Sequence, residues 1–221
     1  GYLPDWLVRI GIRRLLTQRL ENSQSTDVAA FAQHLRSAPL AVETQSANDQ
    51  HYEVAAEFFE SCLGPRLKYS SCLFLDSSTS LAEAEEHMLQ LSCERAAITD
   101  GMSVLELGCG WGSLTLWIAE HFPNCAITAV SNSNSQRKFI ERRAHQQGFS
   151  NIRVITSDMR EFATDDRFDR IVSIEMFEHM RNYALLFSRV ADWLTPEGKA
   201  FVHVFCHRDT PYLFNSEGSD N

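Results

Sequence analysis

The sequence lacks the features of several protein classes. Acidic residues outnumber basic ones by 29 to 20, and the formal net charge of −9 argues against a general nucleic-acid surface, because such surfaces are basic. No apolar run approaches the roughly 20 residues that cross a membrane, and the first residues lack the apolar segment of a signal peptide. Repeats and low-complexity stretches are also missing. The composition therefore favours a globular protein that does not bind nucleic acid.

Paired cysteine spacings are missing as well. The six cysteines are Cys62, Cys72, Cys93, Cys109, Cys125 and Cys206. Neither a CxxC pair nor the spacing of a zinc site occurs among them, which favours free, mostly buried thiols in a reducing compartment. We therefore expect a cytoplasmic protein with no metal site.

A glycine-rich turn lies between an apolar strand pattern and a helical pattern in the middle of the chain. Its residues are Glu106, Gly108, Cys109, Gly110, Trp111, Gly112 and Ser113. Glycine allows positive φ and lets a ligand approach the backbone, so strand, glycine turn and helix together begin a nucleotide-binding α/β unit. Serine replaces the third glycine of the dinucleotide fingerprint, and an acid precedes the first glycine. The alternative is a purely structural turn.

Strand and helix patterns alternate from residue 103 onward. The expected strands are 103–107, 126–130, 152–156, 169–174 and 200–205, and the expected helices are 113–121, 134–146 and 183–194. This alternation predicts a parallel sheet with helices on both faces, and ligands bind outside the carboxyl ends of such strands. We divide the chain into a helical N-terminal extension, residues 1–99, and an α/β core, residues 100–221.

The N-terminal extension is expected to hold several helices and one ordered loop. The helices are predicted at 5–21, 27–37, 51–63 and 80–98, and the loop at 67–74. The first helix is basic and amphipathic, so it either lies on a membrane surface or packs on the domain with its arginines in water. In the last helix one face is predicted to carry the apolar series Leu81, Ala84, Met88, Leu91 and Arg95.

Polar residues follow the second and third strands. The second strand ends without the acid that commonly binds ribose, so amide groups must replace it, and Asn132 and Gln136 are the best candidates. Asp158 follows the third strand, where it can accept a bond from an adenine amino group. Its alternative role is to cap a short following turn.

An acidic turn with a histidine follows the fourth strand. Glu175, Glu178 and His179 place two carboxylates and an imidazole at the mouth of the sheet, where they can accept protons. Amine methylation needs such groups, because most aliphatic amines are protonated at neutral pH and must lose a proton before they attack a methyl group. The alternative is a surface turn with solvated acids.

Five segments in this order resemble one enzyme family. They are 69–72, 104–112, 131–136, 175–180 and 201–207. The chain resembles the cyclopropane-fatty-acid-synthase-like branch of the S-adenosylmethionine (SAM) dependent methyltransferases, and within it the coclaurine-type N-methyltransferases. The resemblance extends over about residues 5 to 215. It implies a Rossmann-like class I methyltransferase sheet, SAM as cofactor and S-adenosylhomocysteine as product.

The resemblance also implies residue roles in cofactor binding. Gly108 and Gly110, with Glu106 before them, line the methionine end of SAM. The residues that fold over the cofactor are Tyr69, Ser70 and Ser71. Those implied at its ribose and adenine ends are Asn132, Gln136, Asp158 and Met159.

Two reactions within this branch remain open. Glu175, Glu178 and His179 would face an amine, with Glu178 and His179 as base and positioner. The sister lipid synthases transfer a methylene group to an acyl double bond with bicarbonate as base, which the resemblance would place near Cys72, Glu178 and His203. Those synthases usually carry glycine where this chain has Glu175. A large acid there suits a cationic amine, so we prefer N-methylation of a small, alkaloid-like secondary or tertiary amine, with lipid transfer at a membrane surface as the alternative.

A third reading concerns the end of the chain. Class I methyltransferase sheets usually finish with a reversed hairpin after the fifth strand, and this sequence stops about where that hairpin should begin. We therefore expect a piece of a longer enzyme, and a SAM-binding module without catalysis is the further alternative. The sequence leaves the oligomeric state open, a homodimer included.

Overall fold

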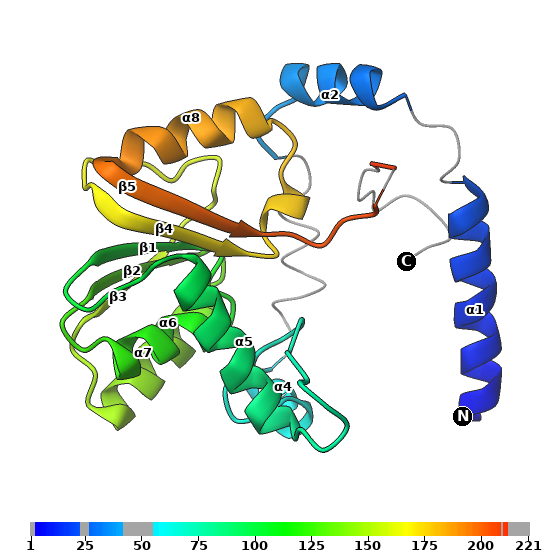
Figure 1. The fold of residues 1–221 in the computed structure, drawn as a ribbon, viewed down its shortest axis with the longest axis horizontal. Coiled ribbons are helices and arrows are strands. Elements are labelled where there is room, and N and C mark those ends of the chain that lie inside the picture. The colour runs from blue at the N-terminus through cyan, green and yellow to red at the C-terminus, as the bar shows by residue number, and fades with distance from the viewer. Residues whose placement is uncertain (1–2, 23–26, 42–54, 209, 212–221) are drawn as a thin grey trace.

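A five-stranded parallel sheet forms the centre of the molecule (Figure 1). The computed structural model describes residues 3–22, 27–41, 55–208 and 210–211. The strands are β1 (Ser103–Leu107), β2 (Ala126–Ser131), β3 (Ile152–Thr156), β4 (Phe168–Ile174) and β5 (Leu194–His203). Their order, β3-β2-β1-β4-β5, confirms the predicted Rossmann-like α/β fold.

Strand β1 lies at the middle of the sheet and is buried on both faces. It pairs with β2 from Ser103 and Ala126 to Leu107 and Val130, and with β4 on its other side. Leu105 and Leu107 pack into the core on one face, whereas Val104 packs into the core on the opposite face. This alternation follows from the two-residue period of a strand, and it leaves the carboxyl end of β1 as the start of the glycine turn.

Helices cover both faces of the sheet. Helices α5 (Leu81–Arg95), α6 (Ser113–His121) and α7 (Asn134–Gln147) lie on one side, and α8 (Tyr183–Trp193) lies on the other (Figure 1). Helix α2 (Val28–Ser37) is attached to the start of α8, where the Asn182 side-chain amide donates to the carbonyls of Arg36 and Ala38 at 3.0 Å each.

Helix α5 begins where the sequence predicts, and the face that it buries only partly matches the predicted apolar series. Ser80 is its N-cap and forms a capping box with Glu83. In the predicted series Ala84 is buried and Met88 and Leu91 are half-buried, but Leu81 is 42% exposed. The buried residues of the helix are Ala84, Glu85, Leu89, Ser92 and Cys93. The helix ends at Arg95 rather than at residue 98. The Glu85 carboxylate and the Ser92 hydroxyl are buried, which a prediction from apolar residues alone does not include.

Strand β5 corrects the predicted strand at 200–205. It begins at Leu194, directly after α8, and ends at His203. Residues 195–198 have the sequence of a turn, but they are part of β5. The pairing of β5 with β4 shifts register at this point. Pro196 fits there because the described part of β5 pairs with β4 alone, so the missing N–H of proline costs no sheet bond.

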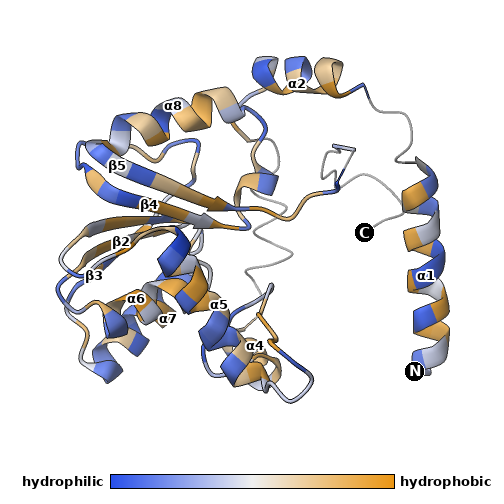
Figure 2. Ribbon diagram, viewed as in Figure 1, coloured by the Kyte–Doolittle hydropathy of each residue, from blue (hydrophilic) through white to orange (hydrophobic). Residues whose placement is uncertain are grey.

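The N-terminal helices α1 (Asp5–Asn22) and α4 (Ala56–Cys62) complete the described elements. Helix α1 stands apart from the sheet (Figure 1) and mixes apolar and hydrophilic residues along its length (Figure 2). Each of its side chains that the structure describes is exposed, so the expectation that it packs on the domain is wrong. The predicted helix at 51–63 begins later, at Ala56, and residues 51–54 lie outside the described part. Among the described helices, none combines the length and apolar character that a bilayer crossing needs.

Candidate cofactor and acceptor site

The glycine turn after β1 needs all three of its glycines. Gly108, Gly110 and Gly112 have φ values of 81°, 52° and 82°, in the left-handed region that favours glycine. A Cβ on Gly108 would lie 2.7 Å from Met176 Cβ, and one on Gly112 would lie 2.6 Å from Ile140 Cγ1. A Cβ on Gly110 would meet no atom of the described residues within 4 Å. Two glycines therefore permit packing, and the middle one opens onto free space.

Glu106 lies behind this turn as a buried carboxylate. Only 3% of the residue is exposed, and its Oε2 accepts a hydrogen bond from the Thr115 hydroxyl. Burial raises the pKa of Glu106 from 4.5 to about 7, although Thr115 and Lys68 act in the opposite direction. Glu106 thus supports the turn from inside, and its contact with a cofactor stays a prediction.

This raised pKa makes the stability of the protein pH-dependent. The folded-state value lies above the unfolded one, so the contribution of Glu106 is complete below about pH 4.5 and is lost as the pH rises through about 7. For Glu106→Gln, we expect the free energy of unfolding relative to wild type to increase by roughly 3 kcal/mol between about pH 4.5 and 8. Chemical denaturation over this range measures it, with the exposed Glu94→Gln as control. A difference that does not vary with pH would contradict the raised pKa.

The loop between α4 and α5 reaches the acidic turn after β4. The hydroxyls of Ser70 and Ser71 both donate to the carboxylate of Glu175, across more than 100 residues of sequence. The Lys68 ammonium donates to the Ser70 carbonyl at 2.8 Å. Tyr69 is 63% exposed, and its ring centroid lies 5.7 Å from that of Phe59. The serine loop and the acidic turn, which the family resemblance links only as successive sequence motifs, are therefore in direct contact.

Glu175 occupies a strained backbone position. Its φ is 51°, a left-handed value that residues other than glycine rarely adopt, and its N–H donates to the His203 carbonyl at 2.8 Å. Burial opposes its ionisation, but the Ser70 and Ser71 hydroxyls overcome this effect and lower the pKa of Glu175. This side chain is therefore held as an anion at the mouth of the sheet.

Glu178, three residues later, has the opposite electrostatic character. Its Oε1 accepts the Phe205 N–H, and its Oε2 is buried with no partner among the residues that the structure describes. Burial raises the pKa of Glu178, and neighbouring Glu175 adds to the effect. Two carboxylates whose environments shift their pKa values apart are typical of sites that hold one charge and exchange one proton. His179 is exposed in the short 3-10 helix Phe177–His179, so its pairing with Glu178 stays a prediction.

Cys72 and His203 lie at the edge of this arrangement. The Cys72 Sγ contacts the Lys68 carbonyl at 3.9 Å, and burial raises the pKa of its thiol. His203 ends β5 and lies partly buried beside the acidic turn. Their role toward a bicarbonate ion stays a prediction of the lipid-synthase alternative.

The residues predicted at the ribose and adenine ends are already engaged. Gln136 is 2% exposed, and its Oε1 accepts the Ser131 hydroxyl at 2.6 Å, so it fixes the turn that carries half-buried Asn132. Both Asp158 oxygens accept bonds from Arg160, and one of them also accepts the Arg160 backbone N–H at 2.8 Å. This matches the turn-capping alternative for Asp158. Met159 is 8% exposed and belongs to the core beneath α8.

Sequence reasoning missed three residues of the site. Lys68 is 7% exposed and lies in the electrostatic field of Glu175, Glu85 and Glu106. Thr115 holds Glu106, and the buried Ser113 Oγ at the start of α6 has no partner among the described residues. The open space at Gly110 and the Ser113 hydroxyl at the N-terminus of α6 fit a ligand that carries polar acceptor groups. SAM is such a ligand.

Comparison with known proteins adds to this geometry. The family model described as mycolic acid cyclopropane synthetase matches residues 41–218. The (S)-coclaurine N-methyltransferase of Thalictrum flavum subsp. glaucum is 39% identical, over 100% of this chain and 63% of that protein. A crystal structure of coclaurine N-methyltransferase bound to N-methylheliamine and SAH matches with a TM-score of 0.91 at 37% identity, over 99% of this chain and 65% of that one. The cyclopropane synthase MmaA2 from Mycobacterium tuberculosis matches with a TM-score of 0.67 at 25% identity, over 76% and 58%.

These matches confirm the family resemblance and the class I methyltransferase sheet that the sequence predicts. The chain spans less than two thirds of the length of these relatives. The family model nevertheless covers most of the chain, including the glycine turn, the serine loop and the acidic turn. The protein belongs to the mycolic acid cyclopropane synthetase family.

Proposed function

We propose that this protein is a SAM-dependent N-methyltransferase that acts on a small cyclic secondary or tertiary amine. The observation that carries the proposal is the pair of carboxylates at the mouth of the sheet, one with a lowered and one with a raised pKa. The similarity to a coclaurine N-methyltransferase over nearly the whole chain supports the same reaction.

The cofactor-binding part of the proposal relies on the glycine turn. When bound, SAM supplies a methyl group on a positively charged sulfur. Gly110 leaves the backbone accessible to SAM. The N-terminus of α6 offers backbone N–H groups that would bind the carboxylate of the methionine part of SAM. Ser70 and Ser71 close the site from the α4–α5 loop. These groups hold and orient the reactants, which is the main need of an in-line methyl transfer.

The amine-binding part relies on Glu175 and Glu178. An amine that arrives protonated is attracted by the ionised Glu175 carboxylate. Glu178 has a raised pKa and a buried oxygen with no partner in the described part of the chain, so it is suited to accept the proton that the amine must lose before it attacks. Because a protonated Glu178 cannot act as a base, activity should fall as the pH drops through this raised pKa.

A transfer assay with methyl-labelled SAM tests the proposal. One arm offers a panel of cyclic secondary and tertiary amines, and the other offers vesicles of unsaturated phospholipid with bicarbonate. We expect label in the amines, and we expect Glu178→Gln to lower turnover by about 100-fold or more while it leaves SAM affinity nearly unchanged. Arg153→Gln, exposed on β3, is the control.

The other outcomes have separate meanings. Label in the lipid would overturn the amine assignment in favour of methylene transfer, the reaction class of the family's cyclopropane synthases. Label in neither arm, with SAM still bound, would indicate a binding module. If Glu178→Gln weakened SAM binding as much as turnover, Glu178 would be a cofactor ligand and not the base.

A further inference from the structure

A fully buried carboxylate holds the loop that carries Ser70 and Ser71. Glu85 on α5 has no exposed surface. Its Oε2 accepts the Arg66 backbone N–H and its Oε1 accepts the Lys68 backbone N–H, both at 2.9 Å. Each oxygen of the buried carboxylate thus has a main-chain donor, an arrangement that fixes the chain direction at residues 66–68.

The loop approaches this carboxylate so closely that a side chain cannot fit between them. A Cβ on Gly64 would lie 2.3 Å from Glu85 Oε2. Leu67, between the two bound amides, has a φ of 52°, and its N–H donates to the Gly64 carbonyl at 3.0 Å. Backbone strain of this kind persists only where surrounding contacts enforce it, and the Glu85 carboxylate supplies two of these contacts.

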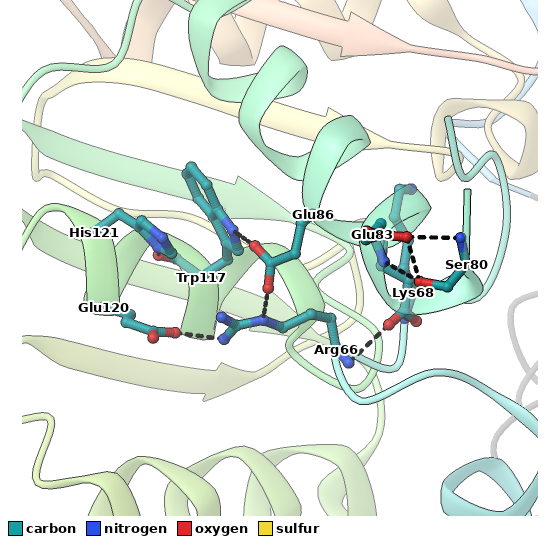
Figure 3. Close-up of polar contacts among 9 residues, drawn as sticks. Arg66, Lys68, Ser80, Glu83, Glu86, Trp117, Glu120 and His121 are labelled. Atoms are coloured by element: carbon teal, nitrogen blue, oxygen red, sulfur yellow. Dashed lines mark hydrogen bonds and ion pairs between the residues drawn. The ribbon is translucent and has the colours of Figure 1, made fainter. Parts of the chain in front are cut away.

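An outer set of contacts attaches the same loop to two helices. The Arg66 guanidinium binds Glu86 of α5 and Glu120 of α6, and the Trp117 indole N–H donates to Glu86 at 2.7 Å (Figure 3). The Glu86 and Glu120 side chains are 39% and 42% exposed, so water screens these ion pairs. The buried Glu85 contacts therefore dominate the placement of the loop.

Lys68 connects this anchored part of the loop to the residues of the site. Its side chain turns inward, and its ammonium binds the Ser70 carbonyl, while Ser70 and Ser71 bind Glu175. We propose that Glu85 is a positioning residue that sets the Lys68–Ser71 segment against the cofactor and the acidic turn. This inference rests on the proposed function, because it assumes that the segment covers SAM.

Replacing Glu85 by Gln tests the proposal. The amide group keeps one acceptor and turns a donor toward the other N–H, so we expect faster hydrogen exchange at the Arg66 and Lys68 amides. We also expect the Kd and KM for SAM to rise by about 10- to 100-fold, with a smaller change in kcat. Gly64→Ala, which displaces the carboxylate from the other side, should give the same result.

Leu89→Ala is the matched control, since Leu89 is 2% exposed, lies one turn further along α5 and belongs to a different core cluster from Leu67 of the loop. A loss of thermal stability in this variant without a rise in the KM for SAM would separate positioning from general destabilisation. Equal rises in Leu89→Ala and Glu85→Gln, or faster amide exchange with unchanged SAM affinity, would overturn the positioning role alone. If the wild-type protein bound no SAM, the proposed function itself would fail, and the positioning role with it.

Discussion

Replacing Gly110 by Val is expected to abolish SAM binding, with a loss of affinity of at least about 100-fold, or roughly 3 kcal/mol. The residue has a φ of 52°, which a β-branched side chain adopts only at high cost. Its Cβ would have no atom of the structurally described residues within 4 Å, so the valine would fill the space that a ligand needs. Isothermal calorimetry with SAM or S-adenosylhomocysteine measures the change.

The matched control for this substitution is Gly148→Val. Gly148 also has a positive φ, 77°, and open space at its Cβ, but it caps the end of α7. We expect it to destabilise the fold by about 1–2 kcal/mol through backbone strain while it retains cofactor affinity. Unchanged affinity in Gly110→Val would refute the cofactor placement. Equal losses in both variants would show that strain, not space, is responsible.

Glu175→Gly is expected to separate stability from activity. Methyl transfer to the proposed amine substrate should fall by about 100-fold or more, because the anion proposed to attract that amine is lost. The backbone, by contrast, is relieved of a left-handed φ of 51° that glycine adopts freely. Labelled transfer at saturating SAM and thermal unfolding measure the two effects in parallel.

Glu175→Ala serves as the comparison, because it removes the same carboxylate and keeps the strain. Glu175→Gly should be more stable than Glu175→Ala by about 1 kcal/mol, and the two should be equally inactive. Amine transfer at the wild-type rate in either variant would contradict the role of the carboxylate. Greater stability of the alanine variant would contradict the left-handed backbone at this position.

Much of the sheet could be predicted because its signals are local. Strand β1 is largely apolar and is followed directly by a glycine, and the capping serine of α5 is visible in the sequence. Strand β5 was misplaced because residues 195–198 contain the proline and glycine of a turn, and only the neighbouring β4 shows that the chain extends through them. The strand conformation of residues 195–198 depends on pairing with β4, which no local sequence pattern encodes.

The site could be predicted only in part for a similar reason. The positions of the polar residues after the strands predict that they belong to the site. The family resemblance predicts that Ser70 and Ser71 belong to the same site as Glu175. Glu85 and Lys68 were missed, because a charged residue in a helix or a loop is ordinarily expected in water. Their burial becomes evident only when the main-chain donors and carboxylates around them are known.

The parallel order of the strands also bears on how the chain folds. Neighbouring strands β1 and β4 are joined at Ser103 and Asp169, 66 residues apart, and the Ser70 and Ser71 contacts with Glu175 span 105 and 104 residues. Such distant contacts form slowly, since the entropy of closing long loops is lost before the pairing stabilises the chain. The serine loop meets the acidic turn where β4 ends, so this contact depends on the position of β4 in the sheet. The proposed cofactor site is therefore complete only in a chain whose sheet is complete.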